Sequence, residues 1–236
     1  MMADIVTQGV TLVVPVLNEG VTIGDVIRAV PRQLVDEVIV VDGGSRDDTV
    51  TRAREAGARV LLEPGSGYGA ASLAGARAAG PKCRVVAFID GDGSDDPADL
   101  ARIVAPVVSG EADFVIGSRI RGEREPGSMG PHQALAGHLA GLAIWLLYGV
   151  RYTDMGPLRA IRRDALDQLQ MREQTYGWNL EMQVRAARDG LRIRELPVRH
   201  RNRAGGKSKV AGSLKGSLRA SAQIALTLAR LVLRAR

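Results

Sequence analysis

Several residue types are scarce in this chain of 236 residues, and each scarcity excludes a class of protein. The single cysteine, Cys83, cannot form a disulfide within the chain, which fits a reducing compartment. Aromatic residues make up only 3% and leave few stacking platforms, so no nucleic-acid partner is expected. The longest apolar stretch, 139–150, is too short to cross a bilayer, and no basic-plus-apolar signal precedes the first expected strand. We therefore expect a cytoplasmic protein.

The positive charge lies mostly at the C-terminal end of the chain. From Arg185 onward there are 14 Lys/Arg and 2 Asp/Glu. Because the whole chain has 32 and 26, the part before Arg185 holds 18 and 24 and is acidic. This asymmetry favours anionic partners for the C-terminal region, such as phosphates, an anionic membrane surface or nucleic acid. The scarce aromatics and the lack of a recognisable nucleic-acid-binding module argue against the last of these.

The first half of the chain alternates strand patterns with helix patterns. Apolar strands are expected at 11–16, 37–42, 59–62, 85–89 and 113–117. Helices are expected between them at 22–29, 47–56, 69–79 and 99–108. Alternation of this kind, with nearly continuous apolar strands, predicts an α/β fold with a mainly parallel central sheet and helices on both faces.

The second half has a different pattern. We expect an apolar helix at 136–149, a turn at 153–159, a helix at 177–189 and a strand at 191–198. A basic Gly/Ser segment, 199–209, leads to a last helix at about 213–233 with an apolar face flanked by cations. Such a helix can lie on a membrane surface or pack on a partner. The expected organisation is one domain over residues 1–210, followed by this C-terminal amphipathic helix within 211–236.

Polar residues follow four of the expected strands at their carboxyl ends. They are Asn18 with Glu19, Asp42, Asp90 with Asp92, and Ser118 with Arg119. In mainly parallel sheets, ligands bind beyond the carboxyl ends of the strands. We therefore predict one binding site at this edge of the sheet.

The acids Asp90 and Asp92 follow the buried strand pattern 85–89 and point to a metal site. Alternate residues of a strand face the same side, so both carboxylates can converge on one cation. Mg²⁺ and Mn²⁺ take few carboxylates and complete their shell with water and phosphates. A calcium loop would need Gly and Glu where Asp95 and Ala101 stand.

A solvated acidic turn is the alternative for this segment, and it accounts for part of it. Asp96 is expected to cap a helix whose first residue is Pro97, with Asp99 as an acid of the first turn. It does not account for two acids directly at the end of a buried strand. The sequence therefore predicts binding of Mg²⁺ or Mn²⁺ and, through it, of a diphosphate.

With these residues in place, the chain resembles the family-two glycosyltransferases of GT-A (nucleotide-diphospho-sugar transferase) fold. It is most similar to the branch that transfers mannose or glucose to polyprenyl (dolichyl) phosphate. The resemblance covers residues 11 to about 209 and rests on five motifs in order. They are Val14 through Glu19, Val40 through Asp47, Asp90-Gly91-Asp92, Gly117-Ser118-Arg119, and Arg203 through Lys209.

The resemblance implies roles for individual residues. Pro15, Leu17 and Glu19 match the loop that contacts the nucleotide, while Val40 and Asp42 match the part that reads the base. A carboxylate such as Asp42 can accept hydrogen bonds from an N–H of uracil or guanine. The alternative for Asp42 is a plain turn residue, because Gly43-Gly44-Ser45 is typical of a turn.

Further matches lie at the phosphate end of the donor. They are Asp90, Gly91 and Asp92 for the metal and donor phosphates, Ser94 near the metal shell, Arg119 near the phosphates, and Arg203 and Lys209 on a basic loop that closes on the diphosphate. Arginine and lysine suit the stabilisation of a leaving diphosphate. The glycine-rich stretch 65–69 lacks the lysine of a phosphate loop and is expected to let the backbone approach the donor closely.

Three departures from the family pattern limit the prediction. Gly43 replaces a second acid beside Asp42, and His132-Gln133 stand where lipid-phosphate transferases often have an arginine. The segment 154–159 replaces a turn that usually carries hydroxyl groups. The first departure leaves nucleotide recognition at that point to Asp42 alone, and the other two make the acceptor less secure than the donor. The multi-helix membrane anchors of such relatives are also missing.

The resulting hypothesis is metal-dependent, inverting transfer of a hexose from UDP-glucose or GDP-mannose to a polyprenyl phosphate. An ionised phosphate acceptor needs no general base, whereas a hydroxyl acceptor does. Asp154 is the first candidate base and Glu181 the second, each with a structural alternative: a salt bridge to Arg159 for Asp154 and a helix-face charge for Glu181. Apolar residues at 139–147 could receive an isoprenoid chain at a membrane surface.

Two other functions stay open at this point. One is transfer to the hydroxyl of a soluble small molecule or glycan. The other is a non-catalytic protein that binds sugar nucleotides. The choices between UDP and GDP and between glucose and mannose, and the number of subunits, also stay open, although an oligomer is compatible with the chain.

Overall fold

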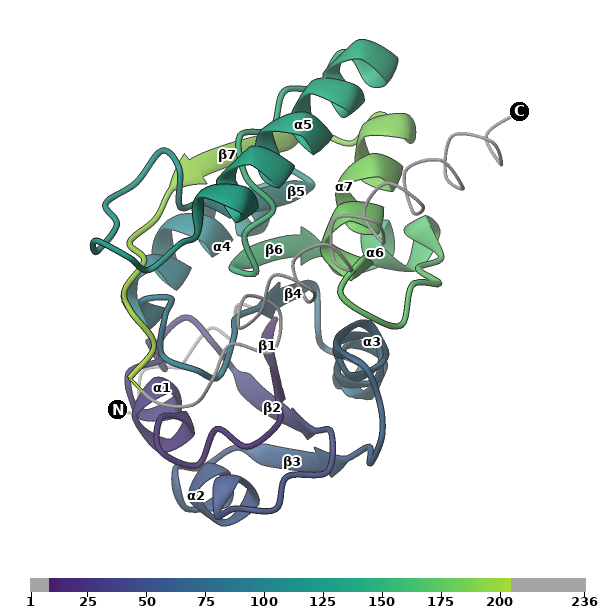
Figure 1. The fold of residues 1–236 in the computed structure, drawn as a ribbon. Coiled ribbons are helices and arrows are strands. Elements are labelled where there is room, and N and C mark those ends of the chain that lie inside the picture. Colours follow the sequence, from purple (N-terminus) through teal and green to yellow (C-terminus); the bar gives the residue numbers. More distant parts are fainter. Residues whose placement is uncertain (1–8, 205–236) are drawn as a thin grey trace.

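The computed structural model describes residues 9–204, without the side chain of His132. A seven-stranded sheet in the order β3-β2-β1-β4-β6-β5-β7 forms its centre (Figure 1). The strands are β1 (Val10–Val16), β2 (Glu37–Asp42), β3 (Arg59–Leu62), β4 (Val85–Phe88), β5 (Phe114–Ser118), β6 (Arg159–Arg162) and β7 (Ile193–Pro197). All pairings are parallel except those of β6, which runs antiparallel to both neighbours.

The helices follow the strands in alternation. They are α1 (Ile23–Arg28), α2 (Thr49–Glu55), α3 (Tyr68–Ala78), α4 (Leu100–Val108) preceded by the 3₁₀ turn η1 (Pro97–Asp99), α5 (Pro131–Tyr148), α6 (Arg163–Leu169) and α7 (Trp178–Arg188). Asp96 caps η1 as expected, since its Oδ1 accepts from the Ala98 amide at 3.0 Å.

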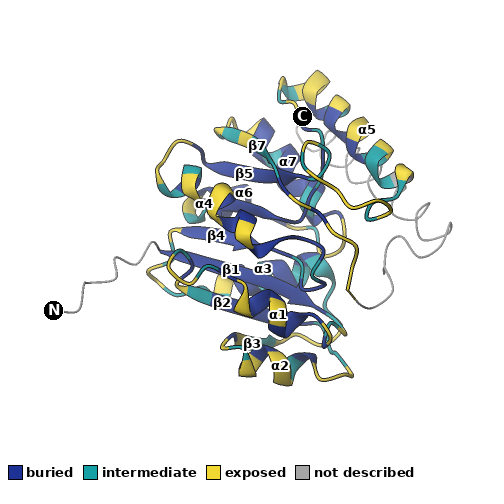
Figure 2. Cartoon of the chain, turned by 90° about the vertical axis from the view of Figure 1, so that its left-hand side faces the viewer, coloured by how far each residue is buried: buried dark blue, intermediate teal, exposed yellow. Residues whose placement is uncertain are grey.

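Alternate residues of β1 feed two separate cores, which explains why the strand is apolar throughout. Leu12 and Val14 face a core shared with α1 and α4. Val13 faces the opposite core, shared with α3, α5, α6 and α7. In Figure 2 the strands are buried between helices that are exposed on their outer sides. The expected sheet with helices on both faces is therefore confirmed.

The antiparallel strand β6 and the helix α6 were not expected. The segment 153–159 was predicted to be a turn, and it is one up to Leu158, but Arg159 then starts a strand between β4 and β5. Its four residues include two arginines, so they carry no apolar run that would predict a strand. Arg159 is fully buried and donates to the carbonyl oxygens of Gly156 and Asn179.

Because β6 is antiparallel, it begins where its neighbours end. Arg159, its first residue, pairs with Phe88, the last residue of β4. The segment before β6 therefore lies at the carboxyl edge of the sheet, together with the ends of β1, β2, β4 and β5. This placement brings Asp154 to the edge at which the sequence predicted a site.

The described residues leave some expectations untested. None of the helices within residues 9–204 combines the length and hydropathy that crossing a membrane requires. The last helix, expected at 213–233, lies outside the described residues, so the division at residue 210 stays a prediction.

Candidate active site

Asp42, the last residue of β2, stabilises the turn that follows it through hydrogen bonds to the backbone of that turn. Asp42 is buried, and its Oδ2 accepts from the amides of Gly44 and Ser45, both at 3.0 Å. Its Oδ1 accepts from the Ser45 hydroxyl, and that hydroxyl oxygen in turn accepts from the Asn18 amide at 2.7 Å. Asp42 therefore stabilises the turn, as its alternative role predicted. Through Ser45 it also holds the loop after β1 against the loop after β2.

The loop after β1 is shaped by a residue with a left-handed backbone. Asn18 has a φ of 54°, and its Oδ1 accepts from the Arg46 amide at 2.8 Å. The Glu19 amide donates to the Thr49 hydroxyl at 2.9 Å, which places Glu19 at the same edge. Pro15 is buried within β1, and Val40 is completely buried within β2. The structure thus gives the Val40 side chain a packing role and leaves Leu17, Glu19 and Asp42 near the edge.

Asp90 and Asp92 lie directly beyond β4, as the sequence predicted. Asp92 is buried, and its Oδ1 accepts from the amide and hydroxyl of Ser94 at 2.9 and 2.6 Å. Gly91 packs against Val16 so closely that a Cβ would lie 2.6 Å from a methyl group of that side chain. Gly91 therefore lets the acidic loop lie against β1.

Asp90 is the most strongly perturbed acid of the site. Burial, together with the negative charges of Asp92 and Asp95, raises the pKa of its carboxyl to about 8 against the opposing effects of Arg203 and Tyr68. Its Oδ1 is buried without a hydrogen-bond partner among the described residues, and so is Oδ2 of Asp95. Asp95 was not singled out from the sequence, where it stood as one acid among several in a turn.

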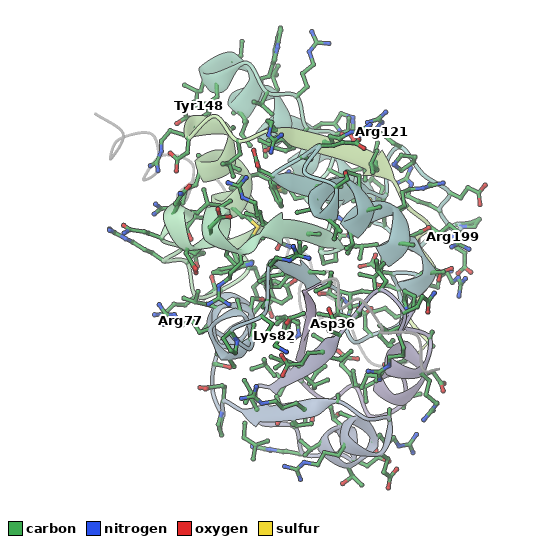
Figure 3. The ribbon with its side chains drawn as sticks, turned by 180° about the vertical axis from the view of Figure 1, so that it is seen from behind. Asp36, Arg77, Lys82, Arg121, Tyr148 and Arg199 are labelled. Atoms are coloured by element: carbon green, nitrogen blue, oxygen red, sulfur yellow. The ribbon has the colours of Figure 1, made fainter. Side chains whose placement is uncertain are left out.

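A strap that follows β7, residues 198–203, crosses this acidic loop. Arg199, labelled in Figure 3, contacts Asp96 at 3.0 Å and Asp99 at 3.2 Å. Three further residues of the strap contact acids of the loop. His200 lies 3.2 Å from Asp95, Arg201 lies 2.6 Å from Asp96, and Arg203 lies 2.8 Å from Asp92. The predicted basic segment thus meets the predicted acidic segment. Lys209 lies outside the described residues.

These contacts test whether the site suits a divalent cation. Within residues 9–204 no cluster of three or more His, Cys, Asp or Glu has metal-binding geometry. Mg²⁺ and Mn²⁺ need only one or two carboxylates when substrate phosphates complete the shell. Asp90 offers an unpartnered buried oxygen, and the Arg203 guanidinium already places a positive charge on Asp92. The donor set therefore fits such an ion together with a diphosphate.

Arg119, at the end of β5, is held by Asp154. Its backbone amide and its Nε donate to Asp154 Oδ2 at 2.9 and 2.8 Å, and its Nη2 donates to Oδ1 at 2.8 Å. The Met155 amide donates to Oδ1 at 2.7 Å. Burial alone would raise the pKa of Asp154, but the hydrogen bonds and charge of Arg119 outweigh it and lower that pKa.

This pairing differs from the role foreseen for Asp154. A carboxylate has about four acceptor positions, and four donors occupy those of Asp154. Its side chain is only 1% exposed. The salt bridge forms with Arg119 and not with Arg159. Such an environment suits a residue that positions Arg119 and does not suit a general base.

Glu195, on β7, was missed from the sequence and holds the same turn from the other side. Its Oε1 accepts from the amides of Thr153 and Asp154 at 2.8 and 3.2 Å, and its Oε2 accepts from the Thr153 hydroxyl at 3.0 Å. Arg121, labelled in Figure 3, donates from Nη1 to the Glu195 carbonyl oxygen at 2.6 Å. Only the pairing of β5 with β7 brings Glu195 here, so no local pattern could reveal it.

Glu181, the second candidate base, has a structural role on α7. Its Oε2 accepts from the amides of Arg172 and Glu173 at 3.0 and 2.7 Å. Its Oε1 pairs with Arg185 Nε at 2.8 Å, one turn along the same helix. Glu181 therefore fixes the segment before α7.

Comparison with known proteins decides the family. The sequence profile of glycosyl transferase family 2 matches residues 11–170, more than half of the chain. The chain belongs to glycosyltransferase family 2. An uncharacterized glycosyltransferase of Mycobacterium tuberculosis is 42% identical over 214 residues, which cover 89% of this chain and 94% of the relative. The undecaprenyl-phosphate mannosyltransferase of Micrococcus luteus is 32% identical and covers 88% and 89%.

The solved structures confirm the GT-A fold of this family 2 enzyme. Glucosyl-3-phosphoglycerate synthase from Mycobacterium tuberculosis, in complex with Mn²⁺, UDP-glucose and phosphoglyceric acid, matches with a TM-score of 0.75 at 26% identity. The match covers 94% of this chain and 79% of that one. The expected family, fold class and transferase activity are thus confirmed, and the Mn²⁺ of that complex is consistent with the expected divalent cation.

Proposed function

We propose that this glycosyltransferase moves a hexose from a nucleoside-diphosphate sugar to a polyprenyl phosphate, with inversion at the anomeric carbon. The observation that carries this proposal is the state of Asp154, whose four acceptor positions are all occupied. Glu181, the other candidate base, is likewise engaged by three donors. An acceptor that needs deprotonation would find neither carboxylate available, whereas an ionised phosphate attacks without a base.

The donor end of the reaction is assigned to the carboxyl edge of the sheet. Asp90 and Asp92 would hold a Mg²⁺ or Mn²⁺ ion, which when bound neutralises charge on the departing diphosphate. Arg203, which contacts Asp92 at 2.8 Å, would bind the same phosphates, and so would Lys209, which lies outside the described residues. Glu19, Leu17 and Asp42 would contact the nucleotide from the loops after β1 and β2.

Arg119 is assigned to the phosphate groups, because Asp154 presents it in a fixed geometry. Nε and Nη2 each donate one hydrogen bond to Asp154, so the two N–H groups of Nη1 and the second of Nη2 would bind substrate oxygens. Because Asp154 is buried and holds Arg119 in place, the pair does not need to rearrange when the substrate binds. This positioning role replaces the general base that the sequence suggested for Asp154.

Two relatives support a lipid phosphate acceptor. One is the undecaprenyl-phosphate mannosyltransferase of Micrococcus luteus, and the other is a UDP-N-acetylglucosamine–dolichyl-phosphate N-acetylglucosaminyltransferase of Methanococcus voltae, 29% identical to this chain. With such an acceptor the enzyme would work at the cytoplasmic face of a membrane. Residues 1–210 would form the catalytic domain, and 211–236 would contact the membrane or a partner.

The test is turnover of a donor and acceptor panel by the full-length chain. UDP-glucose and GDP-mannose are offered with undecaprenyl phosphate in detergent, with and without Mn²⁺, and the glycolipid is measured by mass spectrometry. We expect product only with the metal and the lipid phosphate. Product with dephosphorylated polyprenol, or none with any lipid, contradicts the proposal. Calorimetry with UDP and GDP identifies the base, and nucleotide binding without any turnover indicates a non-catalytic binder.

A second candidate acceptor is a small soluble molecule. The structure of glucosyl-3-phosphoglycerate synthase with phosphoglyceric acid favours it, because that protein shares the fold over 94% of this chain. Phosphoglycerate therefore belongs in the acceptor panel. Transfer to phosphoglycerate in preference to the lipid identifies this second function.

A further inference from the structure

The helix α5 carries its large apolar side chains on the outside of the molecule. Four leucines of its outer face are exposed to 60%, 58%, 49% and 70%: Leu135, Leu139, Leu142 and Leu146. Trp145 beside them is 40% exposed. In Figure 2 α5 is the outermost element on its side, with exposed residues along its length. Solvent exposure of a row of leucines is unfavourable and marks an interaction surface.

The inner face of α5 explains this inverted arrangement. Gly137 and Gly141 face the backbone of residues 152–154, and a Cβ on Gly141 would collide with the Tyr152 carbonyl oxygen. Ala140 and Ile144 complete the buried side. The helix is thus docked on the domain through small residues, so its position is fixed while the leucines stay on the outside.

The spacing of the leucines is symmetric about the middle of the helix. The intervals along 135, 139, 142 and 146 are four, three and four residues. This is the alternation that keeps a seam on one side of a helix in paired helices. Because the order reads the same in both directions, an antiparallel copy would place Leu135 opposite Leu146 and Leu139 opposite Leu142. A two-fold axis requires such self-complementarity.

We propose that this leucine seam pairs with the same seam of a second copy of this chain, making a two-fold symmetric dimer. The helix 131–148 has no Asp, Glu, Lys or Arg, so the leucines of identical faces meet without a charged side chain from the helix between them, and the guanidinium of Arg151 lies to one side, over the Trp145 ring at 4.8 Å. Amphipathic helices on anionic lipid flank their apolar face with several Lys and Arg, whereas this helix itself has none and Arg151 lies just beyond its end. This assignment replaces the expectation that residues 139–147 receive the isoprenoid chain of the acceptor.

The size of the seam sets the expected strength of the dimer. The exposed area of the four leucines and Trp145 is on the order of 500 Å² per copy, against about 800 Å² per partner in a standard interface. We therefore expect association in the micromolar range, with monomer and dimer both populated at working concentrations. Analytical ultracentrifugation of the full chain across concentrations measures this equilibrium.

The first variant places a charge in the seam. Leu139→Glu should raise the dimer dissociation constant by more than about tenfold, because a buried unpaired carboxylate is strongly unfavourable. The matched control is Leu62→Glu on β3, where the leucine is 56% exposed and far from α5 (Figure 1). Circular dichroism checks that both variants are folded. A wild-type chain that stays monomeric at several hundred micromolar overturns the proposal.

A cysteine pairing test checks the register. Leu139→Cys mixed with Leu142→Cys, and Leu135→Cys mixed with Leu146→Cys, should form disulfide-linked dimers under mild oxidation. Leu135→Cys alone should not, because its two copies would lie about 16 Å apart along the helix axis. The wild-type chain, with Cys83 alone, gives the background. Cross-linking of Leu135→Cys alone to the same extent as in its mixture with Leu146→Cys overturns the antiparallel arrangement.

Lipid is the rival occupant and has a distinct readout. Anionic vesicles of phosphatidylglycerol and phosphatidylcholine are sedimented with wild type, Leu139→Glu and Leu62→Glu. Equal vesicle binding by all three, together with a dimer lost only in Leu139→Glu, supports the proposal. Vesicle binding that Leu139→Glu abolishes, by a chain that is monomeric in solution, assigns the face to lipid and overturns it.

Discussion

Arg119, directly after β5, and Asp154, in the segment before β6, are joined by three hydrogen bonds of 2.8 to 2.9 Å in a buried setting. Asp154 thereby fixes both the backbone and the guanidinium of Arg119. Removal of one partner from a buried pair leaves an uncompensated charge, which is strongly destabilising. The pair therefore links the stability of the edge of the sheet to the geometry of the candidate active site.

Asp154→Asn tests this link. We expect the free energy of unfolding to fall by about 3 kcal/mol and kcat/KM to fall by about 10²-fold, because the asparagine cannot accept all four donors. A positioning role lowers activity at every pH without moving the pH profile. Loss of a basic group would instead abolish the acidic limb of that profile. Asp167→Asn, in an exposed pair with Arg163, is the control and should change neither quantity.

Glu195 should act through the same turn. In Glu195→Gln the amide oxygen can still accept from the amides of Thr153 and Asp154, and its NH₂ can donate to the Thr153 hydroxyl. In Glu195→Ala all three hydrogen bonds are lost, which should cost about 2–3 kcal/mol of stability. We expect activity to fall several-fold more in the alanine variant. Equal loss in both variants would show that the charge matters and not the hydrogen bonds.

Asp90→Asn should separate stability from function. Asp90 is buried next to Asp92 and Asp95, and one of its oxygens has no hydrogen-bond partner among the described residues. Removal of its charge should therefore stabilise the metal-free protein by about 1 kcal/mol or more. Turnover with Mn²⁺ should be lost, and Mn²⁺ binding followed by electron paramagnetic resonance should weaken. The exposed Asp25→Asn is the control. Full Mn²⁺-dependent turnover in Asp90→Asn contradicts its role.

Asp113 should make the fold sensitive to acid. Hydrogen bonds from Arg192, with the charges of Arg162 and Arg192, lower the pKa of Asp113 from 3.8 to about 2. A lowered folded-state pKa stabilises the fold above the unfolded value, near pH 4, and this contribution is lost as the pH falls through about 2. Since both arginines are partly exposed, we expect about 1–2 kcal/mol. Urea unfolding of wild type and Asp113→Asn should differ by this amount at pH 6 and converge toward pH 2.

Gly141→Ala tests how closely α5 is docked. Its Cβ would meet the Tyr152 carbonyl oxygen, so we expect a loss of about 1–3 kcal/mol in the free energy of unfolding. The displaced segment leads into Asp154, so activity should fall as well. Gly80→Ala is the matched control, because a Cβ there has no atom within 4 Å. Thermal unfolding of both variants measures the contrast, and an equally stable Gly141→Ala would mean that α5 is loosely held.

Much of the fold could be predicted because its signals are local. The strands β1 to β5 lie within a residue or two of the expected ranges, since each is an apolar run bounded by turn residues. The carboxylates Asp90 and Asp92 were predicted at the edge of the sheet, because chain direction alone puts the residues after parallel strands on one side. Asp96 as a cap and Pro97 as the first residue of its turn were also readable from adjacent positions.

The sequence alone therefore decided where strands end and which polar residues follow them. Both are set by the repeat of apolar residues and by turn residues, which act over only a few positions. Tertiary structure alone decided which of those groups meet. The antiparallel entry of β6 brings Asp154 to Arg119, and the pairing of β5 with β7 brings Glu195 to Thr153. These partners are 35 and 42 residues apart, and each contact exists only because the burial of both cores fixes the order of the strands.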